Sequence, residues 1–228
     1  MKISVILTAF NDEENIKKAI ESILDQSYEN FELITVDDGS SDNTLDILER
    51  YKSFDSRIKV IKNNKNLGLT KSLNKALVYT QGEFIARHDS DDISLKQRFQ
   101  HQVDILNDTR YDFCISRAIN LKTQKAIPRI SYYLPSKFVM KYKNPFIHGT
   151  LMIRKNILTS NGGYDERFYY AQDFKLYYDL LKNGHSFYYI KEPLYLLNVE
   201  NNISSNKKLE QKYYFDCVRN NKSPDKIT

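Results

Sequence analysis

Apolar and polar residues alternate in regular blocks through the first half of the chain. A short, almost wholly apolar run rich in β-branched residues at 3–9 predicts a strand that is covered on both faces, and the runs at 31–36, 58–61 and 83–87 predict three further strands. Between them, apolar residues at helical spacing predict helices around 16–24, 45–51 and 69–80. Strands that alternate with helices about every 30 residues predict right-handed crossovers and a mostly parallel sheet, the core of an α/β domain.

The pattern changes after about residue 110. The second half predicts strands at 111–121 and 147–153, a helix at 171–183, extended chain at 186–199 and a basic helix from 206 to 219. Prolines first appear in this half, at position 128. We therefore divide the single predicted domain into a first half, 1–110, a second half, 111–204, and a C-terminal helix and tail, 205–228.

Composition narrows the class of protein. With 228 residues, of which 41% are apolar, the chain can build one ordinary domain core. No apolar run approaches the roughly 20 residues that span a bilayer, no signal peptide is evident, and two cysteines do not make a disulfide framework. We therefore predict a cytoplasmic protein. The 34 basic and 29 acidic residues give a net charge of +5, which is too mild to indicate a nucleic-acid partner.

Glycine is scarce, with only 7 residues in the chain. Neither G-x-G-x-x-G nor G-x-x-x-x-G-K-[ST] occurs, so dinucleotide-binding oxidoreductases and P-loop enzymes are excluded as leading candidates. If the protein binds phosphates, it must hold them without a glycine-rich loop.

Three polar segments follow the carboxyl ends of predicted strands: Thr8–Asp12, Asp37–Ser41 and Asp89–Asp92. Ligands bind beyond these ends in a parallel sheet, so we expect the segments to converge on one site. Asp89, Asp91 and Asp92 would repel one another, and a hard cation such as Mg²⁺ or Mn²⁺ would relieve that repulsion. The alternative is that these aspartates begin a helix and interact with its dipole.

Asp37 and Asp38 precede a glycine and two serines, as in a turn that leads into a helix. A turn of this kind needs one acidic residue and not two in succession. We therefore interpret one of the pair as an acceptor for ligand N–H or O–H groups.

Several motifs, in this order along the chain, resemble those of family 2 glycosyltransferases. In the first half they are 4–11 (SVILTAFN), 22–27 (SILDQS), 31–44 (FELITVDDGSSDNT), 66–68 (NLG) and 82–93 (GEFIARHDSDDI), with Asn74 and Arg98. In the second half they are 148–154 (HGTLMIR), 162–165 (GGYD) and 171–174 (AQDF). The resemblance extends over nearly the whole chain to about residue 204.

The resemblance implies a GT-A fold, a Rossmann-like three-layer sandwich around a mostly parallel sheet. It also implies transfer of a sugar from a nucleotide diphosphate with inversion at the anomeric carbon. By position, Phe10 would stack on the nucleotide base near Thr8, and Asp38 would accept a hydrogen bond from that base. Asp91 would hold Mn²⁺ or Mg²⁺ on the diphosphate, with Asp89 beside it toward the ribose and the metal.

Asn66 and Lys71 complete the residues that the resemblance places at the donor. Asp173 would be the base that deprotonates the acceptor hydroxyl, although it could also only cap the apolar helix that follows it. Family habit indicates a UDP-sugar as donor and a glycan or lipid-linked oligosaccharide as acceptor. The C-terminal helix would pack on the domain, or it would place the protein peripherally at the inner face of a membrane.

The chain also departs from the family pattern. Gln172 precedes the expected base where many relatives have glutamate, and the Q-x-x-R-W signature of processive synthases is absent, which favours addition of a single sugar. His148 and Glu200 are open candidates for contact with the metal or the donor. Three alternatives remain: a Mg²⁺-dependent phosphoacceptor domain, a sugar nucleotidyltransferase, and a nucleotide-sugar-binding protein without transfer activity.

Overall fold

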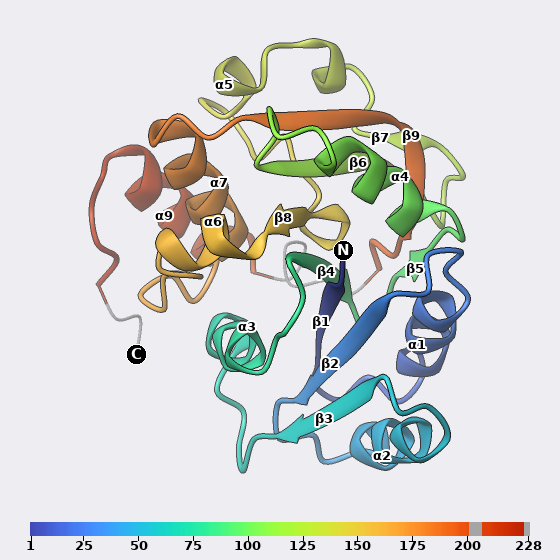
Figure 1. Cartoon of the computed structure of the whole chain (residues 1–228). Coiled ribbons are helices and arrows are strands. Elements are labelled where there is room, and N and C mark those ends of the chain that lie inside the picture. The colour runs from blue at the N-terminus through green and yellow to red at the C-terminus, as the bar shows by residue number, and fades with distance from the viewer. Residues whose placement is uncertain (201–206, 226–228) are drawn as a thin grey trace.

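Within residues 1–200 and 207–225, which the computed structural model describes, nine strands form one sheet (Figure 1). The strand order is β3-β2-β1-β4-β8-β6-β9-β5, and β7 pairs with β6. The strands are β1 Ile3–Ala9, β2 Phe31–Asp37, β3 Ile58–Lys62, β4 Phe84–Asp89, β5 Ile93–Ser94, β6 Phe113–Asn120, β7 Ala126–Ile127, β8 Met152–Arg154 and β9 Phe187–Leu197.

The parallel part of the sheet comes from the first half of the chain. Strands β3, β2, β1 and β4 are all parallel, whereas β8 is antiparallel to both β4 and β6. Strands β6 and β9 form a second parallel pair, and the short β5 pairs antiparallel with β9. Most paired residues thus lie in parallel pairs, as predicted from the alternation of strands and helices.

Helices cover both faces of the sheet and form the two outer layers of the sandwich (Figure 1). They are α1 Ile16–Leu24, α2 Thr44–Phe54, α3 Leu69–Val78, α4 Arg98–Leu106, α5 Ser136–Val139, α6 Lys155–Ser160, α7 Gln172–Lys182 and α9 Lys208–Arg219. Two short 3₁₀ turns, η1 Ser131–Tyr133 and η2 His148–Thr150, complete the described structure.

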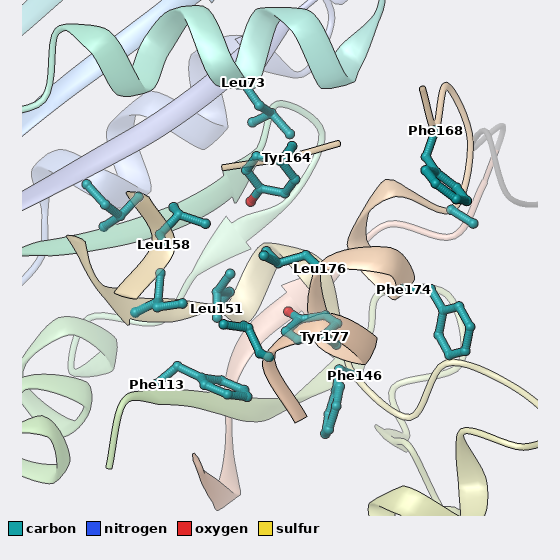
Figure 2. Packing of buried hydrophobic residues seen from close by; sticks show 14 of the residues in the cluster. Leu73, Phe113, Phe146, Leu151, Leu158, Tyr164, Phe168, Phe174, Leu176 and Tyr177 are labelled. Atoms are coloured by element: carbon teal, nitrogen blue, oxygen red, sulfur yellow. The ribbon is translucent and has the colours of Figure 1, made fainter. Parts of the chain in front are cut away.

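Alternation along the strands divides the core into two clusters. On β1, Ile6 faces a cluster with α3, α6, α7 and α9, whereas Val5 and Leu7 face a cluster with α1, α2 and α4. Figure 2 shows the first cluster, where Leu73 of α3 and Tyr177 of α7 lie with Phe113 of β6 and Leu151, which precedes β8. Packing in this cluster therefore fixes the position of α7, the helix that carries Asp173.

One predicted strand is partly wrong. The sequence predicts extended structure over 147–153, but η2 occupies His148–Thr150 and the strand β8 begins only at Met152. The Thr150 hydroxyl donates to the Ile147 carbonyl at 2.8 Å and to the Ser116 carbonyl at 3.2 Å, which stabilises the turn. The apolar pattern alone could not reveal these two contacts.

The C-terminal helix packs on the domain. In α9, Tyr214, Cys217 and Val218 are buried in the first cluster, and Phe215 stacks on Phe174 of α7 with ring centroids 4.1 Å apart. Of the predicted segment 205–228, residues 205, 206 and 226–228 lie outside the described residues. No helix in the described part of the chain is long and apolar enough to cross a membrane.

A fully buried arginine joins the sheet to α4. The Arg98 guanidinium donates to the Arg87 carbonyl at 2.8 Å, to Ser94 Oγ at 2.9 Å and to Gln102 Oε1 at 3.0 Å. Burial lowers the pKa of Arg98 to about 10, so the group remains charged at neutral pH. Its hydrogen bonds fix the chain on both sides of the β4–β5 turn.

Replacing this arginine should destabilise the fold strongly. We expect Arg98→Met to lower the free energy of unfolding by about 3 kcal/mol, because three buried acceptors lose their donor. Chemical denaturation followed by circular dichroism measures the change. The control is Arg110→Met, which removes an exposed guanidinium paired with Asp108 and should change stability by less than about 1 kcal/mol. Equal effects of the two substitutions would contradict this role of Arg98.

Candidate functional site

A cleft of about 1380 Å³ opens at the carboxyl ends of the parallel strands. Its wall includes seven of the eight residues predicted to bind the donor or metal or to act as the base: Thr8, Phe10, Asp38, Asn66, Asp89, Asp91 and Asp173. The structure therefore brings together side chains that are up to 165 positions apart in the sequence. Lys71 is the exception, since it is exposed in the first turn of α3 and does not line the cleft.

The register of the sheet positions the donor-side residues. In the parallel pairing of β1 with β4, Thr8 lies opposite Asp89, so the ends of both strands reach the cleft together. Phe10 follows β1 and is 46% exposed. An exposed aromatic ring on a cleft wall offers a flat apolar face on which a nucleotide base can stack.

The Asp38 carboxylate is buried and already bound within the protein. Its Oδ1 accepts from Asn63 Nδ2 at 2.7 Å and from the Leu67 N–H at 2.9 Å, while Oδ2 accepts from the Gly68 N–H at 2.9 Å. A carboxylate has about four acceptor sites, so these bonds leave one. The observed role of Asp38 is to fix the loop that carries Asn66, and acceptance from a nucleotide base stays a prediction.

The acidic turn after β4 rests on a buried arginine. Arg87 is 1% exposed, and its guanidinium donates to Asp89 Oδ1 at 2.5 Å. The Asp89 N–H in turn donates to the Tyr195 hydroxyl at 3.0 Å. Gly149 leaves room for this arrangement, because a Cβ there would lie only 2.8 Å from Asp89 Oδ2. Asp89 is thus held in place with one oxygen not bonded to Arg87.

Asp91 and Asp92 differ in position. Asp92 is buried, and its Oδ1 accepts from the Asn198 N–H at 2.7 Å, which ties the turn to the end of β9. Asp91 lines the cleft, and burial together with the charges of Asp89 and Asp12 raises its pKa to about 7. Three carboxylates therefore crowd one side of the cleft and repel each other's charge.

This donor set fits a hard divalent cation. Asp89 and Asp91 offer carboxylate oxygens, and a cation between them would relieve the repulsion that, together with burial, raises the Asp91 pKa. Within the described residues, no three His, Cys, Asp or Glu side chains form a complete metal site of their own. Two carboxylates would suit Mg²⁺ or Mn²⁺, which keep positions for substrate phosphates and water.

Asp173 lies in the first turn of α7 and faces the same cleft. Its Oδ1 accepts from the Phe174 N–H at 2.7 Å, and its Oδ2 accepts from Asn144 Nδ2 at 2.7 Å. Burial, and to a smaller extent the charge of Asp89, raises the pKa of Asp173 to about 6. The group is therefore ionised at neutral pH and can still accept a proton, as a general base must.

The two open candidates also lie on the cleft wall. His148 Nε2 and the Tyr164 hydroxyl share a hydrogen bond of 2.8 Å, and burial holds the histidine pKa well below its ordinary value. The Glu200 carboxylate accepts from Lys122 Nζ at 2.7 Å on the surface. Each group thus has a protein partner, and contact of either with a metal or donor stays untested.

Sequence reasoning did not identify three supporting residues: Arg87, Tyr195 and Asn144. Arg87 could have been identified from the sequence, because a charged residue inside a buried strand requires a partner for its charge. Nothing in the sequence marks Tyr195 and Asn144, because their partners, Asp89 and Asp173, are distant in the sequence.

Comparison with known proteins identifies the family that the sequence motifs resemble. The model of glycosyl transferase family 2 matches residues 4–168. EpsE of Bacillus subtilis (strain 168), assigned as a glycosyltransferase, is 36% identical over 199 residues that cover 85% of this chain and 72% of EpsE. WfaP of Escherichia coli, a UDP-Glc:alpha-D-GlcNAc-diphosphoundecaprenol beta-1,3-glucosyltransferase, is 34% identical over 138 residues, which cover 60% of this chain and 49% of WfaP.

Solved structures confirm the fold. TarS of S. aureus (1–349), in complex with UDP, matches with a TM-score of 0.77 and 24% identity over 99% of this chain and 67% of that one. The mannosyltransferase PcManGT of Pyrobaculum calidifontis, in complex with GDP-Man and Mn²⁺, matches with a TM-score of 0.75 and 19% identity over 97% of this chain and 65% of that one. The chain has the predicted GT-A fold, and it belongs to glycosyltransferase family 2.

Proposed function

We propose that this protein transfers a sugar from a UDP-sugar to a hydroxyl group of a glycan or lipid-linked oligosaccharide, with inversion and with help from a divalent cation. The observation that carries the proposal is the composition of the cleft. One cavity is lined both by the acidic turn at Asp89 and Asp91 and by Asp173, a carboxylate with a pKa of about 6.

The proposed reaction needs one base and one stabilised leaving group. The Asp173 carboxylate takes the proton of the acceptor hydroxyl, whose oxygen forms the new bond to the anomeric carbon. The bond between that carbon and the diphosphate oxygen breaks, and the nucleoside diphosphate departs with the electron pair. Attack on the face opposite the leaving group inverts the anomeric centre.

Asp89 and Asp91 would hold the cation on the diphosphate. When bound, such an ion neutralises the negative charge that develops on the leaving group. Arg87 orients Asp89 for this role from beneath, and Asn144 orients Asp173. A cation held by these carboxylates would stabilise the diphosphate in place of a glycine-rich phosphate loop, so the scarcity of glycine is consistent with the proposal.

Two relatives guide the choice of substrates. The name of WfaP states a UDP-glucose donor and a diphosphoundecaprenol-linked acceptor, and TarS has been solved with UDP. PcManGT has been solved with Mn²⁺. These proteins support UDP, a lipid-linked acceptor and a divalent cation as the first substrates and cofactor to test. UDP-glucose and GlcNAc-diphosphoundecaprenol are therefore our probes.

Asp91 should be required for cation-dependent donor binding. We expect UDP with Mn²⁺ to raise the melting temperature of the wild-type chain more than UDP alone does. Asp91→Asn should remove the Mn²⁺-dependent part of the shift, because it removes one of the two carboxylates. Asp25→Asn is the control, since Asp25 is exposed and paired with Lys96 away from the cleft. An unchanged Mn²⁺-dependent shift in Asp91→Asn would refute the assignment.

Asp173 should be required for transfer and not for donor binding. We expect Asp173→Asn to lower the rate at which UDP is released from UDP-glucose in the presence of GlcNAc-diphosphoundecaprenol. The expected decrease is about 10²- to 10⁴-fold, the usual contribution of a general base. The UDP–Mn²⁺ thermal shift should stay unchanged. Asp179→Asn on the same helix is the control, because Asp179 pairs with Lys175 and does not line the cleft.

Two other outcomes of this experiment would contradict the proposal. Full turnover by Asp173→Asn would show that Asp173 is not the base. A wild-type chain that binds UDP with Mn²⁺ but never consumes a donor, over a panel of acceptors, would favour a nucleotide-sugar-binding protein instead.

The pH dependence should report the Asp173 environment. Because protonated Asp173 cannot accept the acceptor proton, the transfer rate should fall as the pH drops below about 6. The hydrogen bond from Asn144 favours the charged carboxylate, so Asn144→Ala should raise the Asp173 pKa and move this acid limb to higher pH. Asn156→Ala on the exposed surface of α6 is the matched control. An acid limb that stays in place in Asn144→Ala would contradict the assignment.

A further inference from the structure

The charge of the chain is distributed unevenly. Between Asp112 and Asp165 there are nine lysine and arginine residues and no aspartate or glutamate. The rest of the chain carries 25 basic and 29 acidic residues. The mild net charge of +5 therefore conceals one strongly basic stretch within an otherwise slightly acidic protein.

Exposed apolar side chains are concentrated inside this stretch. The part from 129 to 143, which we call the 129–143 segment, combines large exposed apolar and aromatic side chains with exposed basic ones. The former are Ile130, Tyr133, Leu134, Phe138 and Tyr142, and the latter are Arg129, Lys137, Lys141 and Lys143. Ile130 is 79% and Tyr133 is 78% exposed. Within the described part of the chain, none of the four basic groups forms a salt bridge.

The segment is anchored to the domain and not loosely attached. Val139, the last residue of α5, and Met140, which follows it, are buried, and Phe146 just beyond the segment belongs to the core cluster of α7. Figure 1 shows α5 at the outer margin of the molecule, beyond β9 and on the opposite side from α2. At its end, Tyr142 and Lys143 line the cleft, so the exposed surface continues to the mouth of the candidate site.

A second cavity, of about 600 Å³, lies beside the segment. Arg117 and Lys191 supply positive charge to its wall, together with the rings of Tyr132 and Tyr189. The Arg117 guanidinium lies over the Tyr132 ring, 5.2 Å from the centroid. Its buried Nε has no hydrogen-bond partner within the described residues. An anionic group that entered this cavity would meet two cations, of which one has an unused donor.

We propose that the 129–143 segment is a docking surface for an anionic lipid bilayer, with the Arg117 cavity taking a lipid headgroup. Aromatic and aliphatic side chains insert at the boundary between headgroups and acyl chains, and the lysines contact the anionic headgroups. The apolar residues distinguish a bilayer from a soluble polyanion, which needs only the basic ones. The uniform positive charge disfavours a second copy of this chain, because a two-fold dimer would place the basic surface against itself.

The inference extends the proposed function and does not depend on it. If the acceptor is lipid-linked, docking through this surface would bring the mouth of the cleft to the membrane that holds the acceptor. Binding to vesicles can be measured whatever the protein transfers, so failure of the docking test and failure of the transfer assay are distinguishable.

Flotation with vesicles tests the proposal. We expect the full chain to float with phosphatidylcholine vesicles that contain phosphatidylglycerol, and not with phosphatidylcholine alone. High salt should weaken this association, because it screens the lysines. The double variant Tyr133→Ser/Lys137→Glu should reduce partitioning onto the anionic vesicles by roughly tenfold or more, since it removes one inserted ring and reverses one charge.

Two matched variants make the same chemical change elsewhere. Lys52→Glu/Phe54→Ser alters α2, where Phe54 is 76% exposed, and Lys208→Glu/Leu209→Ser alters α9, where Leu209 is 82% exposed. Both should float like the wild type. If only the α9 variant lost binding, the C-terminal helix would be the membrane contact and the 129–143 segment would not.

The remaining outcomes are also decisive. Binding to dextran sulfate without binding to vesicles would overturn the proposal in favour of a soluble polyanion. If Tyr133→Ser/Lys137→Glu failed to fold, as judged by its melting curve, Arg129→Glu/Ile130→Ser would take its place with the same expected loss. Wild-type flotation of both folded variants would overturn the docking surface.

Discussion

The geometry of the cleft depends on positive charge that is buried beneath its acidic edge. Arg87 and Arg98 are almost completely inaccessible to solvent, which is unusual for arginine. Arg98 fixes the backbone carbonyl of Arg87, and the Arg87 guanidinium fixes Asp89. Their positive charges partly offset the repulsion among the three aspartates at the end of β4 and in the turn that follows it. The compensation is incomplete, since burial and the charges of Asp89 and Asp12 still raise the pKa of Asp91 to about 7.

The site therefore works against stability at neutral pH. Asp91 and Asp173 have folded-state pKa values of about 7 and about 6, above the ordinary value of 3.8. Groups with raised pKa values favour the folded state when they are protonated, at a pH below their unfolded-state values. That contribution is lost as the pH rises through about 6 to 7. Ionised carboxylates held at such a cost are typical of binding and catalytic sites. A bound cation would recover part of this free energy.

Much of the fold could be predicted because it follows from local periodicity. The strands β1, β2, β3 and β4 are short apolar runs with intervening amphipathic helices, and their ends gave the position of the cleft. The turn η2 could not be predicted, because one of the two hydrogen bonds that stabilise it joins Thr150 to Ser116, which is distant in the sequence.

In the site as well, sequence motifs indicate some residues, whereas contacts between distant parts of the chain cannot be predicted from them. Motifs mark Asp89, Asp91 and Asp173, and all three line the cleft. Lys71, named with the same set, is exposed on α3 and does not line the cleft. The bonds that occupy Asp38 come from residues 63, 67 and 68, which the motif around Asp38 does not contain.

Two electrostatic fields of opposite sign coexist in a chain whose net charge is small. The acidic field is concentrated where strands of the first half end, and the basic field covers an acid-free stretch of the second half. Tyr142 and Lys143 belong to both regions, since they end the 129–143 segment and line the cleft. One chain can therefore attract a cation to the donor side of its cleft and present a cationic surface at the mouth.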